Sequence, residues 1–282
     1  MDDRLMEEYS PAQYPLGYSR DEFARLKTQA HMVAPITVGM MQAAGVSPGM
    51  RVLDLGSGFG DTALLAAELV GPSGYVLGVD ISDRAVGAAR ARPEVATRAN
   101  VEFALGDPRE LDLGEPFDAV VGRYVLMWHR DPADLVRRTL RHLKADGVVA
   151  FHELDWRGLR SEPTCPTFER GAMWITQALL GSGANPYMGT KLRSVFKASG
   201  LRPHLQVTAV IGGADDRSVR EFVDTNLPAS LLEVVIQAGL ATRDEVAFDT
   251  LRQRVLREIE DSDATVIGRS EVTAWARRVP SG

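Results

Sequence analysis

The stretch Arg51–Asp61 reads RVLDLGSGFGD, and Val76–Ser82 follows it as VLGVDIS. An apolar strand enters a loop with glycines at alternate positions, and a helix begins directly after the loop. The second strand ends on Asp80, about 20 residues after the loop, where an acid accepts hydrogen bonds from ribose hydroxyls in nucleotide-binding βαβ units. Glycines let the backbone approach a ligand closely. The pattern therefore predicts a cofactor built on adenosine.

The acidic residues around this loop indicate which adenosine cofactor binds. Asp61 stands where the dinucleotide fingerprint has a glycine or alanine, and a carboxylate at the start of the helix would repel a pyrophosphate. Asp54, before the loop, is placed to pair with a cationic ligand, either directly or through water. A ligand with a ribose, a positive charge and no phosphate fits these residues best. S-adenosylmethionine is such a ligand.

The loop DLGSGFG at residues 54–60 resembles motif I of the class I S-adenosylmethionine-dependent methyltransferases, and further segments match this family in order over residues 35–155. Asp80 matches the ribose-binding acid, and Leu105–Asp107 matches the segment whose acid meets the adenine amino group. Residues 117–123 and 143–149 match the fourth strand and the turn into the fifth. Pro108 departs from the pattern, because many relatives have a small or polar residue there.

The resemblance implies a set of cofactor-binding residues from the loop, the strand ends and the N-terminal arm. They are Asp54, Gly56, Ser57, Gly58, Gly60, Asp80, Ile81, Gly106, Asp107, Pro108, Arg123, Tyr124 and Tyr18. Two alternatives stay open. The arm that carries Tyr18 could dock on the sheet instead of folding over the cofactor, and Arg123 could form a salt bridge at the rim of the pocket.

Strands alternate with helices up to about residue 155, which favours a parallel sheet. The resemblance implies an α/β fold with a doubly wound, mostly parallel seven-stranded sheet, whose sixth and seventh strands form an antiparallel hairpin. A single helix is expected over residues 243–260. The expected units are an N-terminal helical arm or cap (1–45), a cofactor-binding core (46–156), a lid insertion (157–189), the continued core (190–212), a helical lid insertion (213–263) and the last core strand and tail (264–282).

Composition narrows the class of protein. The chain has 282 residues, 45% of them hydrophobic and 25% charged, as in ordinary globular proteins. Its net charge of −6 gives no electrostatic footprint for nucleic acid, and no apolar run is long enough for a membrane span. A single cysteine, Cys165, excludes an internal disulfide framework, and the acidic start is unlike a signal peptide, so we expect a cytoplasmic protein. A small-molecule methyl acceptor is the expected partner, and a homodimer is left open.

His129 and His152 are the candidate catalytic residues, since an unperturbed histidine titrates at about pH 6.5 and can take a proton at neutral pH. His129 could instead be a loop histidine that packs near Trp128 and Asp131. His152 ends the fifth strand, and alternation puts Glu153 and Asp155 on the opposite face. No metal site is therefore expected. His142 is expected to be solvated on a surface helix.

Methyl transfer from a sulfonium is an in-line displacement, which requires alignment of donor and acceptor and exclusion of water. We therefore expect a methyltransferase for a small organic acceptor, such as a natural product or another metabolite, under a lid made by the two insertions and the N-terminal arm. Two alternatives stay open. One is an S-adenosylmethionine-binding protein that catalyses a non-methylating reaction, and the other is an NAD-dependent oxidoreductase.

Overall fold

The computed structural model describes residues 20–227 and 229–278, so the predicted contact of Tyr18 lies outside the described residues. The strands are β1 (Arg51–Leu55), β2 (Tyr75–Asp80), β3 (Val101–Leu105), β4 (Phe117–Arg123), β5 (Leu143–Asp155), β6 (Arg160–Glu162), β7 (His204–Gly212) and β8 (Thr265–Arg277). The helices are α1 (Arg20–Ala44), α2 (Asp61–Val70), α3 (Asp83–Arg90), α4 (Pro93–Ala96), α5 (Pro132–Thr139), α6 (Pro166–Gly181), α7 (Met188–Ala198), α8 (Arg217–Asn226), α9 (Ala229–Gln237), α10 (Arg243–Val246) and α11 (Leu251–Asp261).

Among the described residues, eight strands form one sheet in the order β3-β2-β1-β4-β5-β8-β6, and β7 also pairs with β8. Strands β1 to β5 run parallel, whereas β8 is antiparallel to β5, β6 and β7. The expected mostly parallel α/β sheet and its antiparallel hairpin are confirmed. The short strand β6 is additional to the seven predicted strands.

Both faces of the parallel strands are buried under helices. Val52 packs with α1, α2 and α3 on one face, whereas Leu53 packs with α5 and α7 on the other. A parallel sheet covered on both sides has strands that are apolar almost throughout. Polar side chains such as Asp80 and Arg123 stand at the carboxyl ends of these strands, so functional groups gather at one edge of the sheet.

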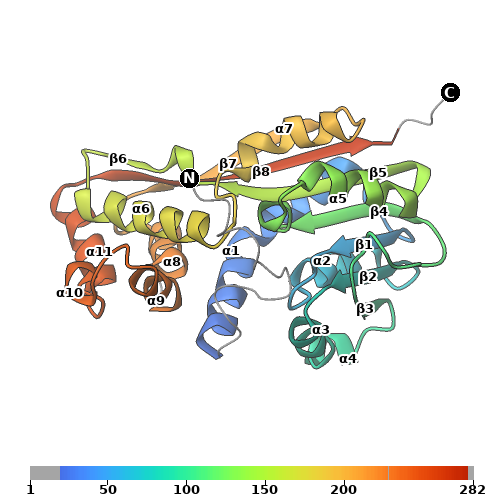
Figure 1. The fold of residues 1–282 in the computed structure, drawn as a ribbon, viewed down its shortest axis with the longest axis horizontal. Coiled ribbons are helices and arrows are strands. Elements are labelled where there is room, and N and C mark those ends of the chain that lie inside the picture. Colours follow the sequence, from blue (N-terminus) through green and yellow to red (C-terminus); the bar gives the residue numbers. More distant parts are fainter. Residues whose placement is uncertain (1–19, 228, 279–282) are drawn as a thin grey trace, which may run out of the picture.

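The lid helices, which we define as α6 and α8 to α11, gather at one end of the molecule, around the first residues of β8 (Figure 1). Strands β1 to β3 lie toward the other end, and α1 passes between the two groups and contacts both β5 and α8. Strand β8 joins the two parts, because Ser270–Arg277 pair with β5 while Thr265–Ile267 pair with β6. The lid is therefore built on an extension of the core sheet.

Two details differ from the prediction. The single helix expected over residues 243–260 is wrong: α10 ends at Val246, the next residue Ala247 has φ +48°, and α11 starts at Leu251. Val246 and Leu251 would lie about 140° apart on one helix, and the turn lets both be buried. His142 is not solvated, because it is buried and its Nε2 lies 2.8 Å from the carbonyl oxygen of Pro108.

Candidate functional site

A cavity of about 320 Å³ lies at the carboxyl ends of β1, β2 and β4, the edge where ligands bind in open α/β sheets. Its wall continues from the loop after β1 to α1 and the lid helices, so one chamber has two ends. The loop end is defined by Gly56, Ser57, Gly58, Asp80 and Ile81. The lid end is defined by Leu154, Trp156, Ile175, Asn226 and Arg269.

The loop requires glycine at its three glycine positions for different structural reasons. A Cβ at Gly56 would lie 2.5 Å from Val125 Cγ2, and one at Gly60 would lie 2.6 Å from Phe103 Cζ. These two glycines are therefore required by their neighbours. Gly58 has φ +51° and no atom within 4 Å of a Cβ position, yet it lines the cavity. At Gly58 the backbone leaves room for a ligand.

Asp80 ties the loop to the end of β2. Its Oδ2 accepts a hydrogen bond from the Gly58 amide at 2.8 Å, and its Oδ1 accepts one from the Ser82 amide at 2.9 Å. Burial raises the pKa of Asp80, although these amides oppose the shift. Each carboxylate oxygen can accept a second hydrogen bond, so the side chain can also receive two vicinal hydroxyls of a ribose.

The wall of the loop end also contains the aliphatic side chain of Ile81 and the ion pair of Asp107 with Arg109. Ile81 is 38% exposed although it is aliphatic, and it lines the cavity together with Pro108. Arg109 donates to both oxygens of Asp107, the shortest contact being 2.6 Å, and these hydrogen bonds lower the pKa of that carboxyl. His129 shares this environment. Burial, followed by the charge of Arg109, lowers the His129 pKa, so the imidazole is neutral at pH 7.

The charge of Asp61 is compensated. Asp61 starts α2 and its Oδ1 lies 2.6 Å from Arg92 Nη1. The repulsion of a pyrophosphate that the sequence predicts at Asp61 is therefore reduced by an arginine far along the chain, and the preference for a cationic ligand depends on Asp54 instead.

Asp54 is a buried carboxylate without a hydrogen-bond partner. It is 1% exposed, and burial raises its pKa to about 8 although the guanidinium of Arg123 is near. The neighbouring Ser57 lines the cavity, and its buried hydroxyl has no partner either. Orphaned polar atoms beside a cavity indicate where a ligand completes the hydrogen bonding. A cation would also stabilise the ionised form of Asp54.

His152 belongs to a buried polar network behind the cavity wall. Its Nδ1 lies 3.0 Å from Thr37 Oγ1, and its Nε2 lies 3.1 Å from Glu271 Oε2. Glu271 also accepts a hydrogen bond from the Tyr124 hydroxyl at 2.7 Å. Burial alone would raise the pKa of Glu271, but Arg269, His152 and Tyr124 lower it to about 2. Since this carboxylate can only accept, His152 carries its proton on Nε2.

Arg269 in the wall of the lid end is among the largest fully buried side chains of the described residues. It is 1% exposed, and its Nη2 lies 2.9 Å from Glu271 Oε1 and 3.2 Å from the Tyr124 hydroxyl. Its Nη1 donates to Asn226 Oδ1. The rings of Tyr124, Trp156 and Phe222 surround the guanidinium, with centroids 5.7, 5.5 and 6.0 Å from Cζ. This cation is therefore held in one position by its neighbours.

Glu153 and Asp155 point away from His152, as alternation requires. Glu153 Oε1 accepts from the amides of Val125 and Leu126 at 2.9 and 2.7 Å. Burial raises the pKa of Glu153 to about 8. Asp155 accepts from Thr190 at the start of α7. Both carboxylates thus fix the backbone around the site, and neither lines the cavity.

The structure divides the sequence-predicted site residues into two groups. The cavity is lined by Gly56, Ser57, Gly58, Asp80, Ile81, Asp107, Pro108, Arg123, Tyr124 and His129. Outside its wall are Asp54, Gly60, Gly106 and His152. The two histidines are not brought together, because His129 lies at the loop end beside Asp107 while His152 is enclosed between α1 and β8.

Sequence reasoning missed Arg269, Glu271 and Asn226. A signal for the first two was present, since two opposite charges at alternate positions of an apolar strand point to the same face and pair there. Nothing comparable marks Asn226 in its helix. No group of three or more metal-ligating side chains occurs within residues 20–227 and 229–278. In the same ranges, no helix has the length and hydropathy needed to cross a membrane.

Comparisons with known proteins identify related methyltransferases. A family described as methyltransferase domain matches residues 46–184. An arsenite methyltransferase of Halobacterium salinarum is 28% identical over 234 residues, which are 82% of this chain and 56% of that protein. A demethylmenaquinone methyltransferase of Lactococcus lactis is 32% identical over 131 residues, 46% of this chain and 50% of that protein. The chain thus spans about half the length of these curated relatives.

A solved structure extends the likeness to the whole fold. Phosphoethanolamine N-methyltransferase 2 of Haemonchus contortus, in complex with phosphomonomethylethanolamine and S-adenosylhomocysteine, superposes with a TM-score of 0.58. The sequence identity is 19%, and the match covers 97% of this chain and 61% of that one. At this identity the likeness shows a common fold.

Proposed function

The chain belongs to the class I S-adenosylmethionine-dependent methyltransferases, and from this premise we propose that it transfers the methyl group of S-adenosylmethionine to a small organic acceptor. One observation carries the proposal. A single cavity joins the glycine loop and Asp80 to an apolar end under the lid helices, so donor and acceptor can lie in one chamber. Alignment of two reactants in this way can remove about 7 to 11 kcal/mol of the barrier.

The residues of the loop end fit the proposed cofactor. Asp80 would hold the ribose, and Gly58 gives the nucleoside its room. Ile81 and Pro108 would contact the adenine, with Asp107 near its amino group. Asp54 is a buried carboxyl behind the wall, and the cationic end of the cofactor would favour its ionised form. When bound, S-adenosylmethionine supplies a methyl group on a positively charged sulfur; the protein residues supply orientation and exclude water.

The chemistry of the pocket separates the acceptors that the relatives' names suggest. Thiolates are the ligands that suit soft elements, and trivalent arsenic is one. The single cysteine, Cys165, is buried and does not line the cavity. An arsenite acceptor therefore has no support here. An apolar organic acceptor, such as a quinone precursor or a natural product, fits the side chains of Leu154, Ile175 and Leu179.

The two histidines have different proposed roles. For an acceptor that must lose a proton in the site, His129 is the base that we propose, because it lines the cavity and is neutral at pH 7. His152 is proposed as a positioning residue, which holds Glu271 and through it the Tyr124 hydroxyl. With such an acceptor, His129→Gln should lower turnover by about 10²-fold. His152→Gln should change KM more than kcat.

A labelled-methyl assay tests the proposal. The protein is incubated with methyl-labelled S-adenosylmethionine and a panel of phenols, carboxylic acids, indoles and carbon acids, and the products are separated. Label should move to at least one acceptor. Tight binding of the cofactor, with label retained on the donor throughout, would favour a non-methylating reaction instead. A fluorescence titration that shows binding of NADH, while S-adenosylmethionine does not bind, would support the oxidoreductase alternative.

The cellular setting remains part of the proposal. The single buried cysteine fits a reduced, cytoplasmic location, and a net charge of −6 argues against a nucleic-acid acceptor. A metabolic role, including secondary metabolism, follows if the acceptor is a natural product. A homodimer would be tested by light scattering of the purified chain.

A further inference from the structure

The lid end holds two hydrogen-bond donors that the protein does not use. Arg269 Nε and Trp156 Nε1 are buried, and neither has a hydrogen-bond partner. Both residues line the cavity, and the Arg269 guanidinium carbon lies 5.5 Å from the centroid of the Trp156 ring. A buried donor left without an acceptor destabilises the folded protein, and a charged donor does so more strongly. Two neighbouring unsatisfied donors therefore indicate that a ligand oxygen belongs there.

The other two nitrogens of the Arg269 guanidinium each have a partner. Nη1 donates to Asn226, and Nη2 serves Glu271 and Tyr124. Asn226 is fixed in turn, because its amide nitrogen donates to the carbonyl oxygen of Phe222 at 2.7 Å. These contacts leave Nε as the guanidinium nitrogen without a partner, with an orientation set by the protein.

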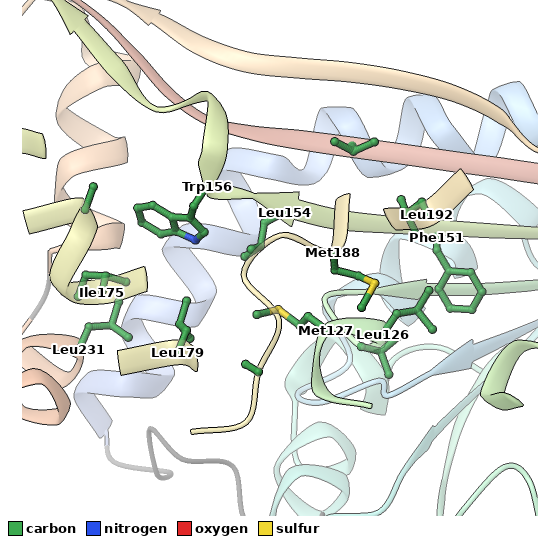
Figure 2. Packing of buried hydrophobic residues seen from close by; sticks show 14 of the residues in the cluster. Leu126, Met127, Phe151, Leu154, Trp156, Ile175, Leu179, Met188, Leu192 and Leu231 are labelled. Carbon is green, nitrogen blue, oxygen red and sulfur yellow. The ribbon is translucent and has the colours of Figure 1, made fainter. Parts of the chain in front are cut away.

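Apolar side chains form the surroundings of these donors. Figure 2 shows Trp156 and Leu154 at the end of β5, near Ile175 and Leu179 of α6 and Leu231 of α9. All five line the cavity and are buried. Such walls accept an apolar ring or chain and exclude the water that would otherwise satisfy the donors.

Positive side chains stand in the wall near the unpartnered donors. Arg25, which contacts the carbonyl oxygen of Thr225, lines the cavity in addition to Arg269, whereas the carboxylate that pairs with Arg269 is Glu271, which stands behind the wall. Arg25 lies close enough to Arg269 to oppose its positive charge. An anion is the ligand that relieves this repulsion in a low-dielectric site.

We infer that the acceptor is an apolar molecule with an anionic oxygen, and that this oxygen accepts hydrogen bonds from Arg269 Nε–H and Trp156 Nε1–H at the lid end. The inference rests on the proposed function, because it names the acceptor class of the same cavity.

Calorimetric titration of matched probes tests the inference. Naphthalene-2-carboxylate and naphthalene-2-carboxamide are titrated into the full chain saturated with S-adenosylhomocysteine. The carboxylate should bind at least about ten-fold more tightly, as expected for hydrogen bonds to a charged group. Arg269→Gln should bring the two affinities close together. Arg217→Gln, at an exposed arginine of α8, is the matched control and should keep the wild-type ratio.

Trp156→Phe keeps an aromatic ring but removes the N–H together with part of the indole, so it tests the inference even if Arg269→Gln does not fold, and the carboxamide probe controls for the lost ring volume. It should weaken carboxylate binding by about five-fold and carboxamide binding by less. Equal affinity of the wild type for the two probes, binding of neither, or an unchanged carboxylate affinity in Trp156→Phe would each overturn the inference. Failure of the wild type to bind S-adenosylhomocysteine would overturn the proposed function instead.

Discussion

The loop end and the lid end of the cavity are built in opposite ways. The loop end comes from one short stretch and the end of the next strand, and it offers backbone amides, glycines and Asp80. The lid end assembles Tyr124, Trp156, Asn226 and Arg269, which lie far apart in the sequence. The donor side is thus encoded locally, while the chemistry of the acceptor side exists only after folding.

The strongest test of this contrast is the removal of the lid-end cation. Arg269→Met leaves Glu271 buried and uncompensated, which should lower the free energy of unfolding by about 3 to 5 kcal/mol in urea at pH 7. Arg269→Met with Glu271→Met should recover most of that loss. Arg217→Met, from an exposed pair with Glu221, should have no measurable effect. A loss below about 1 kcal/mol for the single Arg269 variant would show that the lid end is not held by its buried charge.

At the loop end, the expected effect is on binding and not on stability. Asp80→Asn keeps the shape of the side chain but removes the charge that strengthens its hydrogen bonds to ribose hydroxyls. The Kd for S-adenosylmethionine, measured by calorimetry, should rise about 10- to 100-fold. Asp83→Asn, at an exposed residue in the first turn of α3, is the control. Equal affinities of the wild type and Asp80→Asn would remove the ribose assignment.

The smallest expected effect is the release of a proton from Asp54 when the cofactor binds. Because burial raises its pKa to about 8, most of this carboxyl is protonated at pH 7. A bound cation favours the ionised form and lowers the pKa, so cofactor binding at pH 7 should release up to about one proton, and affinity should rise from pH 6 to pH 8. Calorimetry in two buffers of different ionisation enthalpy measures the release. Asp54→Asn should abolish it, and an identical release in that variant would assign the proton elsewhere.

The same carboxyl fixes the sign of a stability effect. In the folded chain Asp54 keeps its proton up to about pH 8, while the unfolded chain loses it near the ordinary value of 3.8. The folded state therefore binds more protons between these pH values, and the contribution of Asp54 to stability falls as the pH rises through them. A bound cation should oppose this loss.

The fold and the loop end could be predicted from the sequence because their signals are local. Alternating strands and helices indicate the sheet, and the helices α3 and α5 begin at local caps, where Ser82 and Asp131 accept hydrogen bonds from the amides of Ala85 and Asp134. The misjudged details depend on distant partners. Arg92 neutralises Asp61, and Pro108 draws His142 into the interior.

The residues of the lid end could not be predicted from the sequence for a related reason. Arg269 and Glu271 stand in an apolar strand. Their partners become visible only from the register of β8 against β5 and from the Tyr124 hydroxyl, which contacts both side chains. Tyr124 itself has φ +54°, a conformation that its sequence does not announce. Local patterns thus reveal the donor side, and side-chain packing decides the acceptor side.

The register between β7 and β8 has a consequence for how such proteins diversify. Gly212, the last residue of β7, pairs with Val266, near the first residue of β8. The segment between them, residues 213–265 with α8 to α11, therefore leaves and re-enters the sheet at adjacent points. We call this segment the exchangeable cassette. Exchange of this cassette between related chains would replace Asn226 and Leu231 while the sheet and the glycine loop stay intact, so new acceptors could be acquired without rebuilding the nucleoside pocket.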